Sequence, residues 1–164
     1  EELDPAIYEE IVGKLLPKRA TMQAMNLLKS RPYTEYQLRQ KLSMGGYPQD
    51  AQEEAISYVK SYHYIDDRQY AMDYIEYHQE SKTKQKLLQS LMSKGLSKEL
   101  ILECFDEIVG DRKKELEEEQ ILKILRKKNY DPEQWTFEEK QRLMASLYRK
   151  GFSSELIHVH FYLT

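Results

Sequence analysis

Few residues in this chain have the type and spacing that catalysis or metal binding requires. His158 and His160 lie two residues apart, and that spacing on a helix directs the side chains to different sides. Cys104, the single cysteine, falls on the apolar face of a predicted helix, which favours a core thiol over a nucleophile. No glycine-rich phosphate loop, GxSxG or HExxH motif is present. We therefore expect neither enzyme activity nor a metal or cofactor.

The densest polar motif is the run Asp66-Asp67-Arg68, which stands between tyrosines. Paired acids beside an arginine can serve acid–base chemistry. A structural role is the favoured interpretation, because Asp66 precedes Gln69 by three residues at the start of a predicted helix. Asp67 then suits the positive end of the same helix.

Nine basic residues, in three separate stretches of sequence, form the candidate binding site. Between Ser81 and Ser97 there are four lysines and no acidic residue. Such a series attracts a phosphate backbone or acidic protein loops, whereas an ordinary solvated helix face is the alternative. We expect largely exposed side chains on or near one concave side. The nine residues are Arg39, Lys41, Lys82, Lys84, Lys86, Lys94, Arg142, Arg149 and Lys150.

The elements that position these residues are indicated by an internal repeat. Thr34–Val59, Thr83–Ile108 and Glu139–Thr164 share one pattern, in which two leucines four residues apart precede a glycine and a large apolar residue. A long repeat of this kind is typical of stacked helical units that bury a core together. The leucines expected in that core are Leu38, Leu42, Leu87, Leu91, Leu143 and Leu147.

The sequence therefore predicts an all-α protein of three tandem three-helix repeats in an elongated, curved array, without a sheet. The expected repeats are residues 18–63, 64–110 and 111–164, after an acidic helical appendage over 1–17 that ends near Pro17. The expected helices are Arg19–Lys29, Thr34–Met44, Pro48–Tyr62, Asp67–His78, Thr83–Lys94, Lys98–Val109, Asp111–Lys128, Phe137–Lys150 and one capped by Ser153. Ala51, Ala55, Val59 and Tyr62 are predicted to form the inner face of the third helix.

Bulk composition excludes several classes of protein. The net charge of −3 shows that the molecule is no simple polycation, so a nucleic-acid surface must be local. One cysteine rules out an internal disulfide and fits a reducing compartment. No apolar run is long enough to span a membrane. We expect a cytoplasmic monomer.

At this point the motifs resemble those of the RecX family, bacterial regulators of the RecA recombinase. The residues that carry the resemblance are Ala24–Leu28, Arg31–Leu38, Lys41-Leu42, Gly46-Tyr47, Tyr64–Ala71 and Leu91–Leu96. The likeness extends from about Arg19 to the end of the chain, and it is weakest in the third repeat.

The resemblance implies a function without catalysis. A protein of this family binds the RecA–DNA filament, lies along its groove and limits filament growth and strand exchange in recombination and DNA repair. It would act here as a modulator, in the inhibitory direction. The short acidic N-terminal segment and the negative net charge depart from many relatives. The negative net charge favours contact with RecA itself over independent DNA binding. The alternative function is a helical-repeat interaction scaffold unrelated to recombination.

Overall fold

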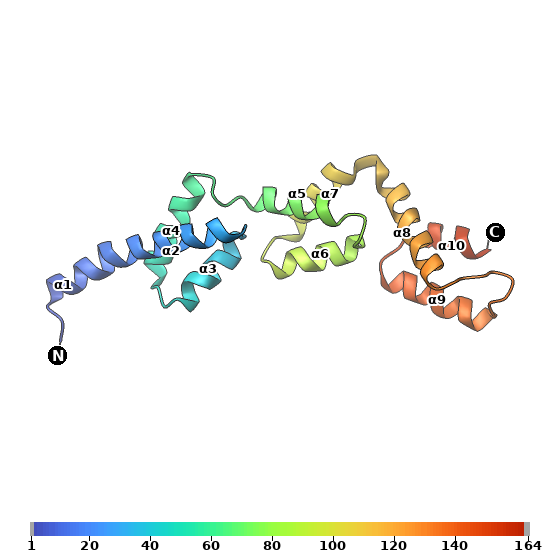
Figure 1. Ribbon diagram of the computed structural model, residues 1–164, viewed down its shortest axis with the longest axis horizontal. Helices are drawn as coiled ribbons and strands as arrows, with labels where there is room; N and C mark the ends of the chain where they lie inside the picture. Colours follow the sequence, from blue (N-terminus) through green and yellow to red (C-terminus); the bar gives the residue numbers. More distant parts are fainter. Residues whose placement is uncertain (1, 163–164) are drawn as a thin grey trace. The chain divides into compact units, whose positions relative to one another are not determined.

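The computed structural model describes residues 2–162, and every regular element in this range is helical (Figure 1). Glu1, Leu163 and Thr164 lie outside the described residues, so the predicted appendage and the last repeat are each described in part. The helices are α1 (Pro5–Glu10), η1 (Ile11–Leu15), α2 (Leu16–Ser30), α3 (Glu35–Met44), α4 (Gln49–Ser61), α5 (Asp67–His78), α6 (Lys84–Ser93), α7 (Lys98–Val109), η2 (Gly110–Arg112), α8 (Lys113–Lys127), α9 (Phe137–Arg149) and α10 (Ser154–Tyr162).

The prediction that the N-terminal helix ends near Pro17 is wrong. The helical segment α1 continues through the π-helical turn η1 into α2 (Figure 1). In that turn the N–H of Leu16 donates to the carbonyl of Ile11, five residues earlier. A wider turn just before Pro17 accommodates a residue that lacks the N–H of a regular helix. Pro17 is consequently a buried residue of the first turn of α2.

Two of the helix starts, those of α3 and α9, are capping boxes. The Thr34 side chain accepts from the N–H of Gln37, and the Gln37 side chain accepts from the N–H of Thr34. Thr136 and Glu139 make the same reciprocal pair at the start of α9. Each pair satisfies N–H groups that have no partner within the helix, and so fixes where that helix begins.

The chain divides into two compact units, and the division passes through the middle repeat. One unit comprises the residues up to Ala71 together with Leu91–Leu100. The other comprises Met72–Ser90 together with the residues from Ile101 onward. Each unit therefore joins a terminal repeat to a part of the middle one.

The core of the first unit is built from α2, α3 and α4, and α2 packs along α4. Ala20 and Ala24 of α2 and Ala51 and Ala55 of α4 are fully buried. Small side chains on facing sides allow two helix axes to approach closely. Leu38 and Leu42 of α3 are also fully buried and complete this core, as the repeat pattern predicts.

The third repeat has its own core between α8, α9 and α10. Ile121, Leu147 and Ile157 are fully buried there, and Leu143 is also buried. In the middle repeat Leu87 and Leu91 are buried, so the six leucines predicted as core all lie inside. The prediction for Tyr62 is wrong: it caps the C-terminal end of α4, is 57% exposed, stacks on Tyr64 and contacts Tyr58 in a tilted arrangement.

Candidate anion-binding site

The nine predicted basic residues divide by exposure. Four of them are exposed: Lys41, Lys86, Arg142 and Arg149. The other five are half-buried, which makes them less accessible than predicted: Arg39, Lys82, Lys84, Lys94 and Lys150. The stems of long side chains pack on neighbouring helices, and this packing covers part of each residue.

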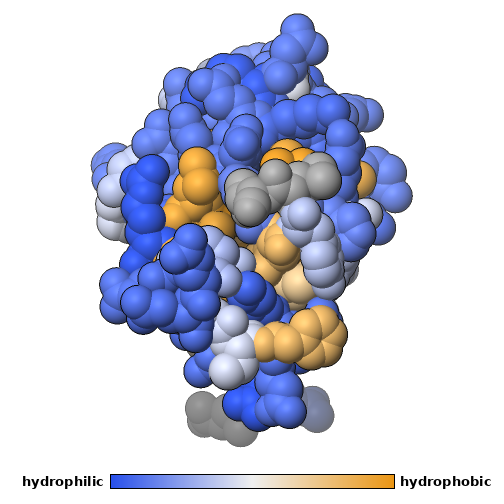
Figure 2. Space-filling model, turned by 90° about the vertical axis from the view of Figure 1, so that its right-hand side faces the viewer, coloured by the Kyte–Doolittle hydropathy of each residue, from blue (hydrophilic) through white to orange (hydrophobic). Residues whose placement is uncertain are grey.

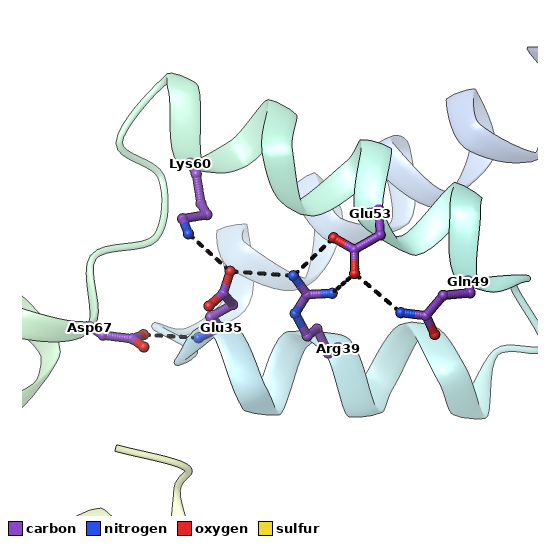
Figure 3. A network of polar contacts seen from close by, with 6 residues as sticks. All are labelled: Glu35, Arg39, Gln49, Glu53, Lys60 and Asp67. Carbon is purple, nitrogen blue, oxygen red and sulfur yellow. Dashed lines mark hydrogen bonds and ion pairs between the residues drawn. The ribbon is translucent and has the colours of Figure 1, made fainter. Parts of the chain in front are cut away.

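Arg39 is held in an ion-pair network on the surface of the first unit (Figure 3). Its Nη1 lies 2.6 Å from Glu53 Oε1, and its Nη2 lies 3.5 Å from Glu35 Oε1. Lys60 also reaches Glu35, at 3.1 Å. The hydrogen bond with Glu53 raises the pKa of Arg39 and lowers that of Glu53. Because carboxylates already balance its charge, Arg39 is a weak candidate for a phosphate ligand.

The Asp66-Asp67 motif has the structural role that the sequence favours. Asp66 Oδ1 accepts from the N–H of Gln69 at 3.1 Å and so caps α5. Asp67 Oδ1 accepts from the N–H of Glu35 at 2.9 Å, which ties the start of α5 to the start of α3 (Figure 3). Burial, followed by the charge of Glu35, raises the pKa of Asp67.

The second unit contains a basic hollow of about 370 Å³ beside the start of α6. Five lysines line it, together with one carboxylate, that of Glu80. The lysines come from α6 (Lys86), from α8 (Lys123 and Lys127), and from the residues that directly follow α8 (Lys128) and α9 (Lys150). Among residues 2–162, none of these five makes an ion pair. We call this site the lysine hollow.

Lys150 is the most enclosed of the five lysines. Burial lowers its pKa, and the neighbouring charges of Lys86, Lys128 and Lys127 lower it further. The ammonium groups therefore stand close enough to repel one another. A negatively charged ligand would relieve that repulsion.

A second, smaller hollow of about 250 Å³ shares Lys150, Thr83 and Gln120 with the lysine hollow. Part of its lining is apolar, and the Nζ of Lys84 lies 5.0 Å from the centroid of the Phe105 ring. Burial lowers the pKa of Lys84, and so does the adjacent Lys113. Nearby Lys82 donates to the Tyr74 hydroxyl at 2.7 Å.

Two glutamines fix the helices that line the hollows. Gln120 of α8 donates to the carbonyls of Gln79 and Lys82, each at 2.9 Å. The amide nitrogen of Gln85, in the orientation that its surroundings favour, donates to the carbonyls of Arg149 at 2.8 Å and Lys150 at 3.0 Å. The middle and last repeats are thus joined by hydrogen bonds beside the lysines.

The structure brings together only part of the predicted set. Lys82, Lys84, Lys86 and Lys150 line the two adjoining hollows, whereas Arg142 and Arg149 line neither. Sequence reasoning missed Lys113, Lys123, Lys127 and Lys128, all supplied by or next to α8. The signal for the last three was the basic end of the charged segment Asp111–Lys128, where no acid follows Glu119.

The face in view in Figure 2 is mostly hydrophilic, and its hydrophobic residues form small separate patches. Within residues 2–162 no group of three potential metal ligands converges. In the same range no helix has the length and apolar character needed to cross a bilayer. Cys104 is buried, as predicted.

The helices and their repeated docking define a class of protein: an all-α array of three-helix repeats. Models of the RecX first and third three-helix domains match residues 20–58 and 115–158. The chain is 31% identical over 165 residues to the Regulatory protein RecX of Caldanaerobacter subterraneus subsp. tengcongensis, covering all of this chain and 80% of that protein. The chain belongs to the RecX family.

Other comparisons agree with this assignment. The Regulatory protein RecX of Clostridium botulinum strain Eklund 17B is 33% identical over 128 residues, which span 76% of this chain and 58% of that relative. A crystal structure of regulatory protein RecX has a TM-score of 0.77 at 23% identity, covering 99% of this chain and 81% of that chain. A crystal structure of RecX from Lactobacillus salivarius has a TM-score of 0.72 at 20% identity, covering 88% of this chain and 93% of that chain. The two solved structures share the all-helical fold.

Proposed function

We propose that this chain regulates RecA nucleoprotein filaments in recombination and DNA repair, as a cytoplasmic monomer that acts by stoichiometric binding without catalysis. It would bind along the filament groove and inhibit filament growth and strand exchange. The observation that carries the proposal is membership of a family whose relatives are named regulatory proteins, over the full length of this chain. The inhibitory direction is what the family resemblance implies.

The basic residues supply the contact surface in this proposal. The contacts to filament phosphates or acidic loops of RecA would come from Lys82, Lys84, Lys86 and Lys150. Proposed members of the surface also include Lys41, Lys94, Arg142 and Arg149. The ion pairs of Arg39 support a smaller role for that residue. Since each phosphate contact releases condensed counterions, binding should weaken steeply as the salt concentration rises.

The test of function adds the protein to RecA during DNA-dependent ATP hydrolysis and strand exchange. A regulator lowers both rates as it approaches a stoichiometric ratio to RecA. Unchanged rates at stoichiometric excess contradict the proposal and favour an interaction scaffold for another partner. Filament length by electron microscopy, measured on the same samples, distinguishes blocked growth from blocked strand exchange.

The test of the surface reverses two charges on α6. The double variant Lys84→Glu/Lys86→Glu should bind the filament more weakly and with a smaller salt dependence. Lys29→Glu/Lys98→Glu is the matched control, because both lysines are exposed and lie outside the two hollows. Circular dichroism checks that each variant stays folded. Equal filament binding by the two double variants would remove α6 from the contact surface.

A further inference from the structure

The lysine hollow contains more positive charge than its single carboxylate neutralises. Five ammonium groups and a single carboxylate line about 370 Å³, in a chain whose net charge is −3. None of the five lysines makes an ion pair within the described part of the chain, whereas Arg39 and Lys60 in the first unit do. Uncompensated like charges repel one another and oppose folding. The arrangement is therefore that of a site for an anion.

The type of cation indicates the class of anion. The hollow is lined by lysines and contains no arginine, although Arg126 and Arg149 lie close by in the sequence. Arginine forms planar, two-pronged pairs with carboxylates, while a cluster of lysines surrounds a tetrahedral phosphate as separate point charges. Thr83 lines the same hollow at the start of α6, where the partial positive charge of the helix end adds to the lysines.

We propose that the lysine hollow is a phosphate-binding site that takes a ligand with at least two neighbouring phosphate groups. Lys150 and the three lysines whose positive charges act on it, Lys86, Lys127 and Lys128, would surround the first group, since all four line the hollow. Lys123 and the N-terminal end of α6 would face the second phosphate group. The proposal deepens the proposed function, but its test contains no RecA, so either can fail alone.

The position of the site gives phosphate binding a structural consequence. Its lining comes from α6, α8 and the end of α9, which belong to the middle and last repeats of the second unit. A phosphate group would replace repulsion between these helices with attraction, and so hold the two repeats together. Ligand that binds only the folded chain raises the midpoint of thermal unfolding.

The experiment measures binding of inorganic pyrophosphate to the intact chain by calorimetry and by thermal unfolding, at low salt. At about a hundredfold excess over Kd, Tm should rise by about 5–10 °C. Lys86→Gln/Lys128→Gln should bind at least about tenfold more weakly, because two charge-assisted contacts are lost. Lys29→Gln/Lys98→Gln removes the same number of charges from exposed positions elsewhere, and it should bind as the wild type does.

Two results would overturn the proposal. One is equal affinity of the two double variants, which would mean that the total charge of the chain decides binding. The other is a response to citrate as large as that to pyrophosphate, which would mean that the hollow takes any compact polyanion. Competition with a short oligothymidylate then separates the sources of phosphate. Displacement of pyrophosphate assigns the site to a nucleic-acid backbone, and its retention assigns the site to a free phosphate compound.

Discussion

Gly95, which ends α6, lies directly against Tyr36 of α3. A Cβ atom at Gly95 would be 2.2 Å from the Cβ of Tyr36, and the φ of Gly95 is +87°. Beside this contact the Thr34 hydroxyl donates to the carbonyl of Lys94 at 2.6 Å. The next repeat follows the same plan, because Gly151 lies against Gln85 in the other unit. The recurring glycine thus follows the end of one helix and packs against a helix of the preceding repeat.

Gly95→Ala should lower the free energy of unfolding by about 3 kcal/mol or more. The left-handed backbone costs an alanine about 1–2 kcal/mol, and the clash with Tyr36 adds an overpacking cost of similar size. Urea denaturation measures the change. Gly46→Ala is the control, because Gly46 has a φ of +82° but nothing within 4 Å of its added Cβ.

The comparison separates backbone strain from steric contact. Gly46→Ala should cost only about 1–2 kcal/mol, the strain alone. The cost of Gly151→Ala should lie between the costs of the other two substitutions. The added Cβ would be 3.4 Å from the Cβ of Gln85, and the Gln85 side chain can move. If all three substitutions cost the same, the docking of Tyr36 on Gly95 contributes nothing to stability.

Leu91→Ala should cost about 2–5 kcal/mol, because Leu91 is fully buried and the residual cavity adds to the lost transfer energy. Met92→Ala is the neighbouring control on the same helix, since Met92 is 48% exposed. Its cost should stay below about 1 kcal/mol. Chemical denaturation of both variants tests this, and similar losses would contradict the buried register of the repeat.

Arg39 and Glu53 should show a small favourable coupling in a double-mutant cycle of Arg39→Met and Glu53→Gln, weaker in high salt than in low salt. Both side chains are partly exposed, at 31% and 51%, and solvent screens their attraction. Unfolding in low and high salt gives the coupling and its screening. A coupling near zero in low salt would show that the pair is unimportant for stability and would return Arg39 to the candidate binding residues.

The contribution of Lys150 to the stability of the fold should increase as the pH rises from its lowered pKa to about 10.5. Burial and the charges of Lys86, Lys128 and Lys127 lower its pKa from the ordinary value of 10.5, although the carboxylates of Glu80 and Glu117 line the two hollows that Lys150 borders. Between the lowered pKa and 10.5 the unfolded chain binds more protons, so the free energy of unfolding increases with pH. Below the lowered pKa the charged lysine destabilises the fold by a constant amount.

Lys150→Met should therefore stabilise the chain at pH 7 and flatten this rise. Denaturation midpoints at pH 7, 8.5 and 10 measure both effects. Lys29→Met, at an exposed position outside the hollows, serves as the reference for loss of one positive charge. An unchanged pH profile in Lys150→Met would show that the repulsion within the lysine hollow has no cost to folding.

The elements of the fold were predictable because their signals are local. Thr34 with Gln37 and Thr136 with Glu139 mark helix starts by short-range hydrogen bonds, and the leucines mark the buried face by helical period. Pro17 and Tyr62 were predicted wrongly. The π-turn that admits Pro17 involves a hydrogen bond from Leu16 to Ile11 that composition does not reveal, and the ring of Tyr62 packs against the neighbouring Tyr58 and Tyr64 in place of core residues.

The candidate site was predicted only in part, because charge along a sequence does not say which cations meet. The sequence alone identified the repeats, the family resemblance and the acid-free lysine segment that contains Lys86. Tertiary structure decided that Glu53 neutralises Arg39, and that Lys127 and Lys128, 41 residues or more beyond Lys86, face it across one hollow. Helix periodicity fixes which face of a helix is buried, whereas the packing of separate helices decides which charges come close enough to act on one ligand.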